Sequence, residues 1–498
     1  MQPISIKNNQ SLPLSSIPEF SYEDFFALNT GLVAEKSERH CVNYFGISET
    51  NGVKLFCCIA DDLEHIIYIS CCKIQLDSNL PSFSAKLFCF EKFEREIHEN
   101  FGVGFTDHPW LKPVRYAFDR ADRSQQIANY PFYSIDSEEL HEVGVGPIHA
   151  GVIEPGHFRF ICNGEQILHL EIQLGYQHRG IEKMFIQNQE FSRWVTLAES
   201  IAGDTVVGHS TAFAQIWESL CGFETTREID FCRTVALELE RIAIHTGDLS
   251  ALCTDIAYQL GSSVFGRLRT PIINFMQEWC GNRLSKGLIR PGQNRFQFTP
   301  ELAERLRQVL DAFEPDFLEM NKELFSLPSA LSRFERTGVV STEDASAIGT
   351  VGMAARTSGV QRDIRATHPH SLYPELQHEI KVKRHGDVYS RVQMRKNEVI
   401  QSIGYLRSMV ANLPDKNPIL KLSAPGGNLF ALSLVEGWRG EICHCAITGS
   451  KGELVHYKIK DPSFHNWLAL ALAVRNNEIS DFPICNKSFN LSYCGHDL

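Results

Sequence analysis

Residues 144–160 read G-V-G-P-I-H-A-G-V-I-E-P-G-H-F-R-F, and the stretch that they open continues to Ser210. It includes L-G-Y-Q-H-R-G-I-E-K-M at 174–184 and W-V-T-L-A-E-S-I-A-G-D-T-V-V-G-H-S at 194–210. Glycine and proline hold the backbone in special dihedrals. Polar, restricted segments inside an ordinary globular chain are where functional sites tend to lie. The site is therefore expected here, among the histidines and carboxylates of the stretch: His149, His157, His178, His209, Glu154 and Glu182.

The composition is that of a folded globular protein with more than one core. The chain has 498 residues, of which 43% are hydrophobic and 22% are charged. A chain of this length usually divides into two or more domains. The net charge of −12 argues against a general nucleic-acid binder. The beginning, M-Q-P-I-S-I-K-N-N-Q, lacks the apolar core of a signal peptide, which predicts a cytoplasmic location.

Fifteen cysteines would prompt a search for metal sites, but no C-x-x-C motif occurs. The close pairs are Cys57-Cys58, Cys71-Cys72 and Cys443-x-Cys445. Adjacent cysteines in apolar, strand-like runs usually behave as small buried hydrophobic residues. We therefore expect these pairs to belong to the core.

Periodicity divides the chain into four segments. Residues 1–20 are polar and predict a loose lead-in, and 21–120 alternate between strand-like and helical patterns. Residues 121–142 are polar and predict a linker. Residues 143–498 become mainly helical, as the apolar spacing of 227–260 indicates. The expected fold class is α+β, with a small α/β domain followed by a mainly helical one.

Several long motifs in the later segment resemble one family. They are the 144–210 stretch, G-M-A-A-R-T-S-G-V-Q-R-D-I-R at 352–365, G-D-V-Y-S-R-V-Q-M-R-K-N-E-V-I-Q-S at 386–402 and V-E-G-W-R-G-E-I at 435–442. In this order they closely resemble the large subunit of membrane-bound, energy-converting [NiFe]-hydrogenases of the formate hydrogenlyase and hydrogenase-4 type. They also resemble the large peripheral subunit of respiratory complex I. Several long matches in order are far more specific than one short motif.

A second motif lies in the earlier segment. F-E-R-E-I-H-E-N-F-G-V-G-F-T-D-H-P-W-L-K-P-V-R-Y at 93–116 resembles complex I's smaller soluble peripheral subunit. The E-R-E residues Glu94, Arg95 and Glu96 then imply interface ion pairs that dock a neighbouring subunit. The alternative is a solvated helix face. Together the two resemblances imply a fusion of the small and large peripheral subunits.

The metal ligands of the hydrogenase family do not carry over to this chain. The resemblance places the four thiolate positions at Ala202, Thr205, Ser492 and Gly495, none of which is cysteine. Nickel and iron in such centres need soft sulfur donors, and hydroxyls are hard, weak ligands. Cys494 lies one position out of register. We therefore expect no metal on this chain, and we expect the four positions to converge around a polar cavity.

The resemblance to complex I suggests groups that handle protons at that cavity. The family's loop histidine corresponds to the His149–His157 region, and its helix aspartate to Asp255, ten residues after His245. His157 and Asp255 form the candidate couple, because a carboxylate partner raises the pKa of a histidine. The alternative is a satisfied buried histidine and a capping or interfacial aspartate. The other candidate cavity residues are His149, Glu154, Arg356 and Asp363.

The favoured function is a peripheral-arm subunit of a membrane-associated, redox-driven ion-pumping complex, held on the inner face of the membrane by its partners. The resemblance implies a small iron–sulfur subunit and antiporter-like and quinone-site-like membrane subunits as partners. Quinone and NAD are then expected only at the level of the complex. The family's quinone-facing tyrosine falls near Trp194, which has no phenolic proton, and no G-x-G-x-x-G motif is present. The alternatives are a non-catalytic scaffold and an active hydrogenase with unusual ligands.

Overall fold

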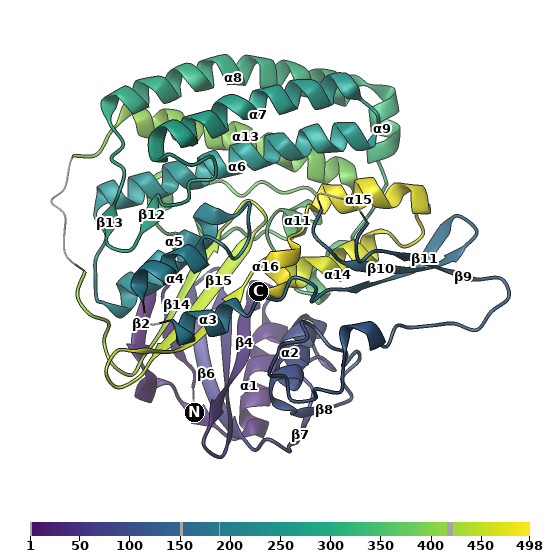
Figure 1. The fold of residues 1–498 in the computed structure, drawn as a ribbon, viewed down its shortest axis with the longest axis vertical. Coiled ribbons are helices and arrows are strands. Elements are labelled where there is room, and N and C mark those ends of the chain that lie inside the picture. The colour runs from purple at the N-terminus through teal and green to yellow at the C-terminus, as the bar shows by residue number, and fades with distance from the viewer. Residues whose placement is uncertain (1, 150–152, 189, 416–421) are drawn as a thin grey trace.

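The computed structural model describes residues 2–149, 153–188, 190–415 and 422–498. A β-sheet formed by the earlier part of the chain lies at one end of the molecule, and a layer of long helices lies at the other (Figure 1). A second sheet lies between them (Figure 1). The described chain combines helices and mainly antiparallel sheets, which confirms the expected α+β class.

The first sheet has five strands, in the order β1-β6-β5-β4, with β3 paired in parallel to β6. Their bounds are Ile4–Ile6 (β1), Glu19–Phe20 (β3), Arg39–Glu49 (β4), Gly52–Asp61 (β5) and Ile66–Ile74 (β6). Helices α1 (Tyr22–Glu35) and α2 (Glu91–Phe101) pack against it, and β7 (Asn79–Pro81) pairs with β8 (Gly104–Thr106). Helix α1 begins where the Ser21 side chain accepts a hydrogen bond from the Asp24 N–H. Helix α2 ends at Gly102, whose φ of 75° favours glycine.

The prediction of a loose lead-in over residues 1–20 is wrong. Ile4 of β1 pairs with Ile69 of β6, so the lead-in extends the first sheet. Strand β2 (Gln10–Pro13) pairs instead with β14 (Leu429–Glu436), with Leu12 opposite Phe430. Both strands are short and partly polar, and each is stabilised by a partner strand distant in sequence, which local periodicity does not reveal.

The second sheet has the order β16-β15-β14-β2, with β15 at Glu441–Thr448 and β16 at Leu454–Lys460. It shares a hydrophobic core with the first sheet, where the Phe56 ring lies 5.9 Å from the Phe430 ring. The paired cysteines belong to these cores as expected: Cys57, Cys58, Cys71, Cys72, Cys443 and Cys445 are all fully buried. The domain border at 121–142 stays a prediction, although strand β9 (His141–Val145) crosses its end.

The E-R-E residues of α2 form their ion pairs within this chain, so the prediction that they dock another subunit is wrong. Glu96 is paired with Arg115 and with Lys458 of β16, whose Nζ lies 2.6 Å from Glu96 Oε1. Arg95 is paired with Glu91, and Glu94 accepts hydrogen bonds from Ser82, Phe83 and Ser84. All three are buried. The Glu96–Lys458 pair joins the earlier and later parts of the same chain.

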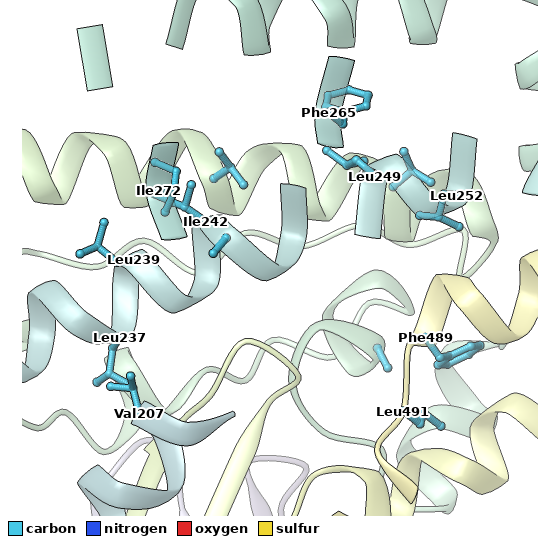
Figure 2. Close-up of a cluster of buried hydrophobic side chains, with 14 of the residues drawn as sticks. Val207, Leu237, Leu239, Ile242, Leu249, Leu252, Phe265, Ile272, Phe489 and Leu491 are labelled. Atoms are coloured by element: carbon cyan, nitrogen blue, oxygen red, sulfur yellow. The ribbon is translucent and has the colours of Figure 1, made fainter. Parts of the chain in front are cut away.

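Four long helices form the helical layer: α6 (Arg227–Asp255), α7 (Gln259–Cys280), α8 (Pro300–Ser326) and α13 (Val388–Ala411). Thr226, Thr299 and Asp387 cap α6, α8 and α13 through their side-chain oxygens. Figure 2 shows the apolar side chains between them, with Phe265 of α7 beside Leu249 of α6. Phe489 and Leu491, near the C-terminal end, join the same cluster (Figure 2). None of the helices in the described ranges is long and apolar enough to cross a membrane.

Shorter elements connect these layers. A three-stranded sheet has the order β11-β10-β9, with β10 at His157–Asn163 and β11 at Gln166–Gln173. The remaining α-helices are α3 (Ile181–Gln187), α4 (Phe191–Ala198), α5 (Val206–Leu220), α9 (Pro328–Phe334), α10 (Thr342–Ala347), α11 (Gly352–Thr357), α12 (Ile364–Thr367), α14 (Ser463–Ala473), α15 (Phe482–Phe489) and α16 (Tyr493–Asp497). A two-stranded ribbon is formed by β12 (Ile289–Arg290) and β13 (Gln293–Asn294).

Candidate functional site

The turn between α4 and α5 meets the segment that leads into α16. We call this region the junction and define it by the four positions that the family resemblance singled out: Ala202, Thr205, Ser492 and Gly495. All four are buried. Thr205 immediately precedes α5, and Ser492 caps α16 by accepting a hydrogen bond from the Gly495 N–H at 2.9 Å.

Two arginines hold the two sides of the junction together. Arg439 donates to Thr205 Oγ1 at 3.0 Å and to the Asn490 carbonyl at 2.5 Å. Arg179 donates to the Ile201 carbonyl at 2.9 Å and to the Cys494 carbonyl at 3.2 Å. The segments around 201–205 and 490–495 are therefore adjacent in space, as the sequence predicted for the four positions.

The donor set at the junction does not suit a nickel–iron centre. A Cβ added to Gly495 would lie 2.7 Å from Asp461 Oδ2 and 2.9 Å from Ser492 Oγ, so a thiolate has no room there. Cys494 Sγ lies 3.5 Å from Ser492 Oγ, and burial raises the pKa of this thiol to about 11. Within the part of the chain that the structure describes, no group of three or more His, Cys, Asp or Glu side chains is placed to hold a metal ion.

The loop before β10 brings one predicted carboxylate to the junction. Glu154 Oε2 accepts a hydrogen bond from the Cys494 N–H at 3.2 Å. His149 Nε2 lies 3.5 Å from the Tyr493 hydroxyl, on the residue before Cys494. Burial lowers the pKa of His149. Of the six candidate cavity residues, Glu154 and His149 are the two that contact α16.

His157 and Asp255 do not form the predicted couple. His157 Nδ1 lies 3.2 Å from the Gly146 carbonyl, and the His157 ring packs 5.2 Å from the Phe132 ring. Burial lowers the pKa of His157, whereas a carboxylate partner would have raised it. Asp255 is exposed at the last position of α6. The motif identified His157 and Asp255 by their positions in the sequence. It did not predict which residues would lie next to them in the fold.

Arg356 and Asp363 lie elsewhere, in what we call the core ion cluster: Arg241, Arg356, Asp363, Arg365, Glu398 and Glu436. Arg356 Nη1 lies 3.2 Å from Asp363 and 2.7 Å from Glu436, and its Nη2 donates to Glu398 at 2.5 Å. Each of these side chains is at least 99% buried. The expectation that Arg356 and Asp363 surround one cavity with Glu154, His157 and Asp255 is therefore wrong, because they form ion pairs between helices and strand β14.

Two buried carboxyl groups beside the junction are held mainly by backbone N–H groups. Asp497 accepts from Gly175 at 2.9 Å and from Gln177 at 2.8 Å, and burial raises its pKa to about 7. Glu240 accepts from Val207 at 2.8 Å and from Gly208 at 3.3 Å, and burial raises its pKa to about 8. Both carboxyl groups therefore change charge near neutral pH.

A hydrogen-bonded chain leads away from the junction at Asp461. His209 Nε2 lies 3.0 Å from Asp461, His209 Nδ1 lies 3.0 Å from His444 Nε2, and His444 Nδ1 lies 2.8 Å from the Tyr457 hydroxyl. With Asp461 ionised, every donor in this chain points toward it: Tyr457 to His444, His444 to His209, and His209 to Asp461. His209 was singled out in the sequence but was given no role. The run D-P-S at 461–463, which contains Asp461, was the clearest sequence feature that was overlooked.

Trp194, where the quinone-facing tyrosine of complex I was expected, is buried in the core. Its Nε1 donates to the Phe185 carbonyl at 2.7 Å, and its ring packs 4.7 Å from the Trp217 ring. The indole N–H is therefore used within the fold. Trp194 acts here as a core residue of α4.

Comparison with known proteins establishes the family. Residues 259–425 match the family model described as the respiratory-chain NADH dehydrogenase 49 kDa subunit. One of the NADH-quinone oxidoreductase subunits of Chloroherpeton thalassium is 30% identical over 380 residues, which cover 70% of this chain and 85% of the relative. The chain belongs to this family.

Other known proteins are similar to this chain in sequence or in fold. Formate hydrogenlyase subunit 5 of Escherichia coli is 27% identical over 481 residues, which cover 92% of this chain and 82% of that protein. A chain of the membrane-bound sulfane sulfur reductase, an archaeal respiratory membrane complex, superimposes with a TM-score of 0.68 at 21% identity. The match covers 74% of this chain and all of that one, and it supports the fold.

Proposed function

We propose that the chain is a peripheral-arm subunit of a membrane-associated, redox-driven ion-pumping complex. Its relatives by sequence are subunits of hydrogenase and NADH-quinone oxidoreductase complexes, which supports the assignment to such an arm. A partner iron–sulfur subunit would carry the electrons past the junction. Membrane subunits would hold the chain at the inner face of the membrane, and quinone and NAD would be used by the complex as a whole.

The observation that carries this proposal is the junction itself. At the junction two segments that are distant in sequence lie side by side, as a bimetallic centre requires. The space at Gly495, however, is filled by Asp461 and Ser492. Four thiolates are therefore replaced by a hydrogen-bonded network, and no step through nickel or iron follows for this chain. The residues that remain are suited to holding protons, since Asp497 and Glu240 titrate near neutral pH.

Glu154 has a particular place in this proposal. It is the predicted carboxylate that contacts α16, and the Asp497 carboxyl that titrates near neutral pH lies three residues beyond Cys494. The charge of Glu154 also adds to the rise in the pKa of Asp497. Glu154 would therefore exchange protons with the α16 region while the partner subunit changes its redox state.

The experiment is Glu154→Gln in the intact complex, with Glu165→Gln on the exposed β10–β11 turn as its matched control. Ion uptake into inverted vesicles is measured against the yield of complex on a native gel. We expect Glu154→Gln to lower uptake about tenfold or more while the yield is kept, since a positioned proton carrier contributes on this scale. Normal uptake in both variants would leave the scaffold role as the better assignment.

Nickel analysis of the same preparation separates the remaining alternative. Stoichiometric nickel bound to this subunit would contradict the proposal and favour an active hydrogenase with unusual ligands. Redox titration of the intact complex with candidate acceptors then identifies which reaction drives transport.

A further inference from the structure

A cavity of about 450 Å³ lies between the first sheet and the helices that follow residue 340. Its rim includes Ser37, Lys86 and Ser346, which are exposed, so the cavity is reached from the surface. Its floor includes His40 and Thr350, which are 8% and 2% exposed. A volume of this size is typical of small-molecule sites, which range from about 300 to 1,000 Å³. None of the junction residues lines it.

The charged side chains that line this cavity are all cations. They are Arg39, Lys86 and Arg362, and the lining contains no aspartate or glutamate. The carboxylates that balance the arginines lie behind them: Arg39 Nε donates to Asp61 at 2.8 Å and Arg362 Nε donates to Asp62 at 2.7 Å. The walls therefore present guanidinium groups whose orientation is already fixed by ion pairs.

Lys86 adds a positive charge at the rim. Its Nζ lies 4.3 Å from the centre of the Phe26 ring, a cation–π contact that holds the ammonium group over an aromatic face. Such a contact leaves the N–H groups of the ammonium available to a ligand. The rim and walls therefore offer three cationic groups and no carboxylate to an anion in the cavity.

Two buried polar atoms at the floor have no hydrogen-bond partner among the described residues. They are the Thr350 hydroxyl oxygen and His40 Nδ1. His40 uses its other ring nitrogen for Glu441, at 2.7 Å, and its Nδ1 lies 3.6 Å from Asp62. Native proteins leave few buried polar atoms unpaired, because each costs about 1–3 kcal/mol. Both atoms are covered by neighbouring groups, so they lie beneath the floor, and a ligand would be held by the walls and the rim.

Glycine at position 349 allows the wall to close. Gly349 has a φ of 71°, and an added Cβ would lie 2.9 Å from Cβ of Cys89. The turn after α10 can therefore approach the segment before α2 closely enough to form one wall of the cavity from two distant parts of the chain.

From the cationic walls and the volume, we propose that this cavity binds a small phosphate-bearing anion. The planar guanidinium groups of Arg39 and Arg362 match phosphate oxygens. The site joins the earlier and later parts of the chain, so an occupied cavity would stabilise their association.

Isothermal titration calorimetry of the full chain with pyrophosphate tests the proposal, with citrate as a carboxylate anion of comparable charge. We expect one saturable pyrophosphate site per chain and weaker binding of citrate. Absence of saturable pyrophosphate binding would overturn the proposal, and citrate binding as tightly as pyrophosphate would overturn the assignment to phosphate.

Three variants locate the site. Arg362→Gln should weaken pyrophosphate binding more than about tenfold, since it removes a charge-assisted contact. This change leaves Asp62 with less charge compensation, so two milder variants accompany it. Lys86→Gln should weaken binding about fivefold. Arg39→Lys should weaken it about threefold, because the ammonium group keeps the positive charge but loses the planar fork that matches phosphate oxygens.

Lys322→Gln, an exposed change on α8, is the matched control and should bind as the unmodified chain does. If Lys86→Gln and Arg39→Lys both bind pyrophosphate with unchanged affinity, the anion does not occupy this cavity and the proposal fails.

Discussion

The core ion cluster and the junction both bury carboxyl groups completely, but they hold them with different partners. In the core ion cluster, burial acts to raise the pKa of Glu398, yet Arg356, His245 and Arg241 hold it well below its usual value. Beside the junction, Asp497 is held mainly by backbone N–H groups, and burial raises its pKa to about 7. Guanidinium partners fix a charge permanently, whereas amide partners leave the carboxyl able to gain and lose a proton.

One group in the core ion cluster departs from this rule. Glu436 faces Arg356 at 2.7 Å, but burial and the neighbouring Asp363 raise its pKa to about 7. Here three carboxyl groups, those of Asp363, Glu398 and Glu436, share Arg356. The pKa of a buried carboxyl group therefore depends on how many guanidinium groups are available to it. The presence of one guanidinium group is not enough.

The largest expected effect is that of Glu398→Gln. This change removes the carboxylate that bonds Arg356 at 2.5 Å, Arg241 at 3.1 Å and His245 at 2.9 Å. The free energy of unfolding should fall by about 3–5 kcal/mol, because buried cations are left uncompensated. Urea denaturation measures it, with the exposed Glu375→Gln, which pairs with Arg227, as a control expected to cost less than about 1 kcal/mol. Equal effects of the two changes would show that the cluster is not structural.

Asp497→Asn should change how stability depends on pH. Between about pH 4 and pH 7 the folded chain keeps a proton on Asp497 that the unfolded chain has released. The free energy of unfolding of the unmodified chain should therefore fall as pH rises through this window, and level off above about pH 7. The contribution over this window is on the order of 4 kcal/mol. The measurement is the difference in free energy of unfolding between the unmodified chain and Asp497→Asn from about pH 5 to about pH 8. A difference that does not change with pH would rule out a raised pKa at Asp497.

Gly495→Ala should destabilise the junction sterically. Its Cβ would meet Asp461 Oδ2 at 2.7 Å, and Asp461 is itself held by His209. Overpacking of this kind should lower the free energy of unfolding by about 2 kcal/mol. Gly404→Ala in α13 is the control, since its Cβ would meet nothing within 4 Å and alanine favours a helix by about 1 kcal/mol. A junction that accepts the alanine without loss would have space for a larger side chain.

The smallest expected effect is that of Tyr457→Phe. It removes the hydroxyl that bonds His444 Nδ1 at 2.8 Å, at the end of the chain that leads to Asp461. Loss of one buried hydrogen bond should cost about 1 kcal/mol, measured by thermal unfolding. Tyr133→Phe, at a half-exposed position, should have no effect. If Tyr457→Phe cost as much stability as Glu398→Gln, the hydrogen-bonded chain from Tyr457 to Asp461 would be as important to folding as the core ion cluster.

Local sequence signals predicted the elements whose stability is local. Helix α6 has a capping side chain and apolar spacing within a single segment, so the sequence of 227–260 was sufficient to predict it. Strand β2 was missed because its partner lies in β14, and no pattern within Q-S-L-P indicates that partner. At the site, the motifs located the junction, but Arg179 and Arg439 were missed. From sequence alone, an arginine in a loop is expected to be solvent-exposed. Its role becomes visible only when the structure shows the backbone carbonyls to which it donates.

The pairing of β2 with β14 has a consequence for the order in which the chain folds. Asn8, just before β2, is hydrogen-bonded to the Leu434 carbonyl, 426 residues away. During synthesis the second sheet lacks a strand partner for Gln10–Pro13 until β14 has been made, so this early segment must stay unpaired through most of translation. An unpaired strand is prone to associate with other chains.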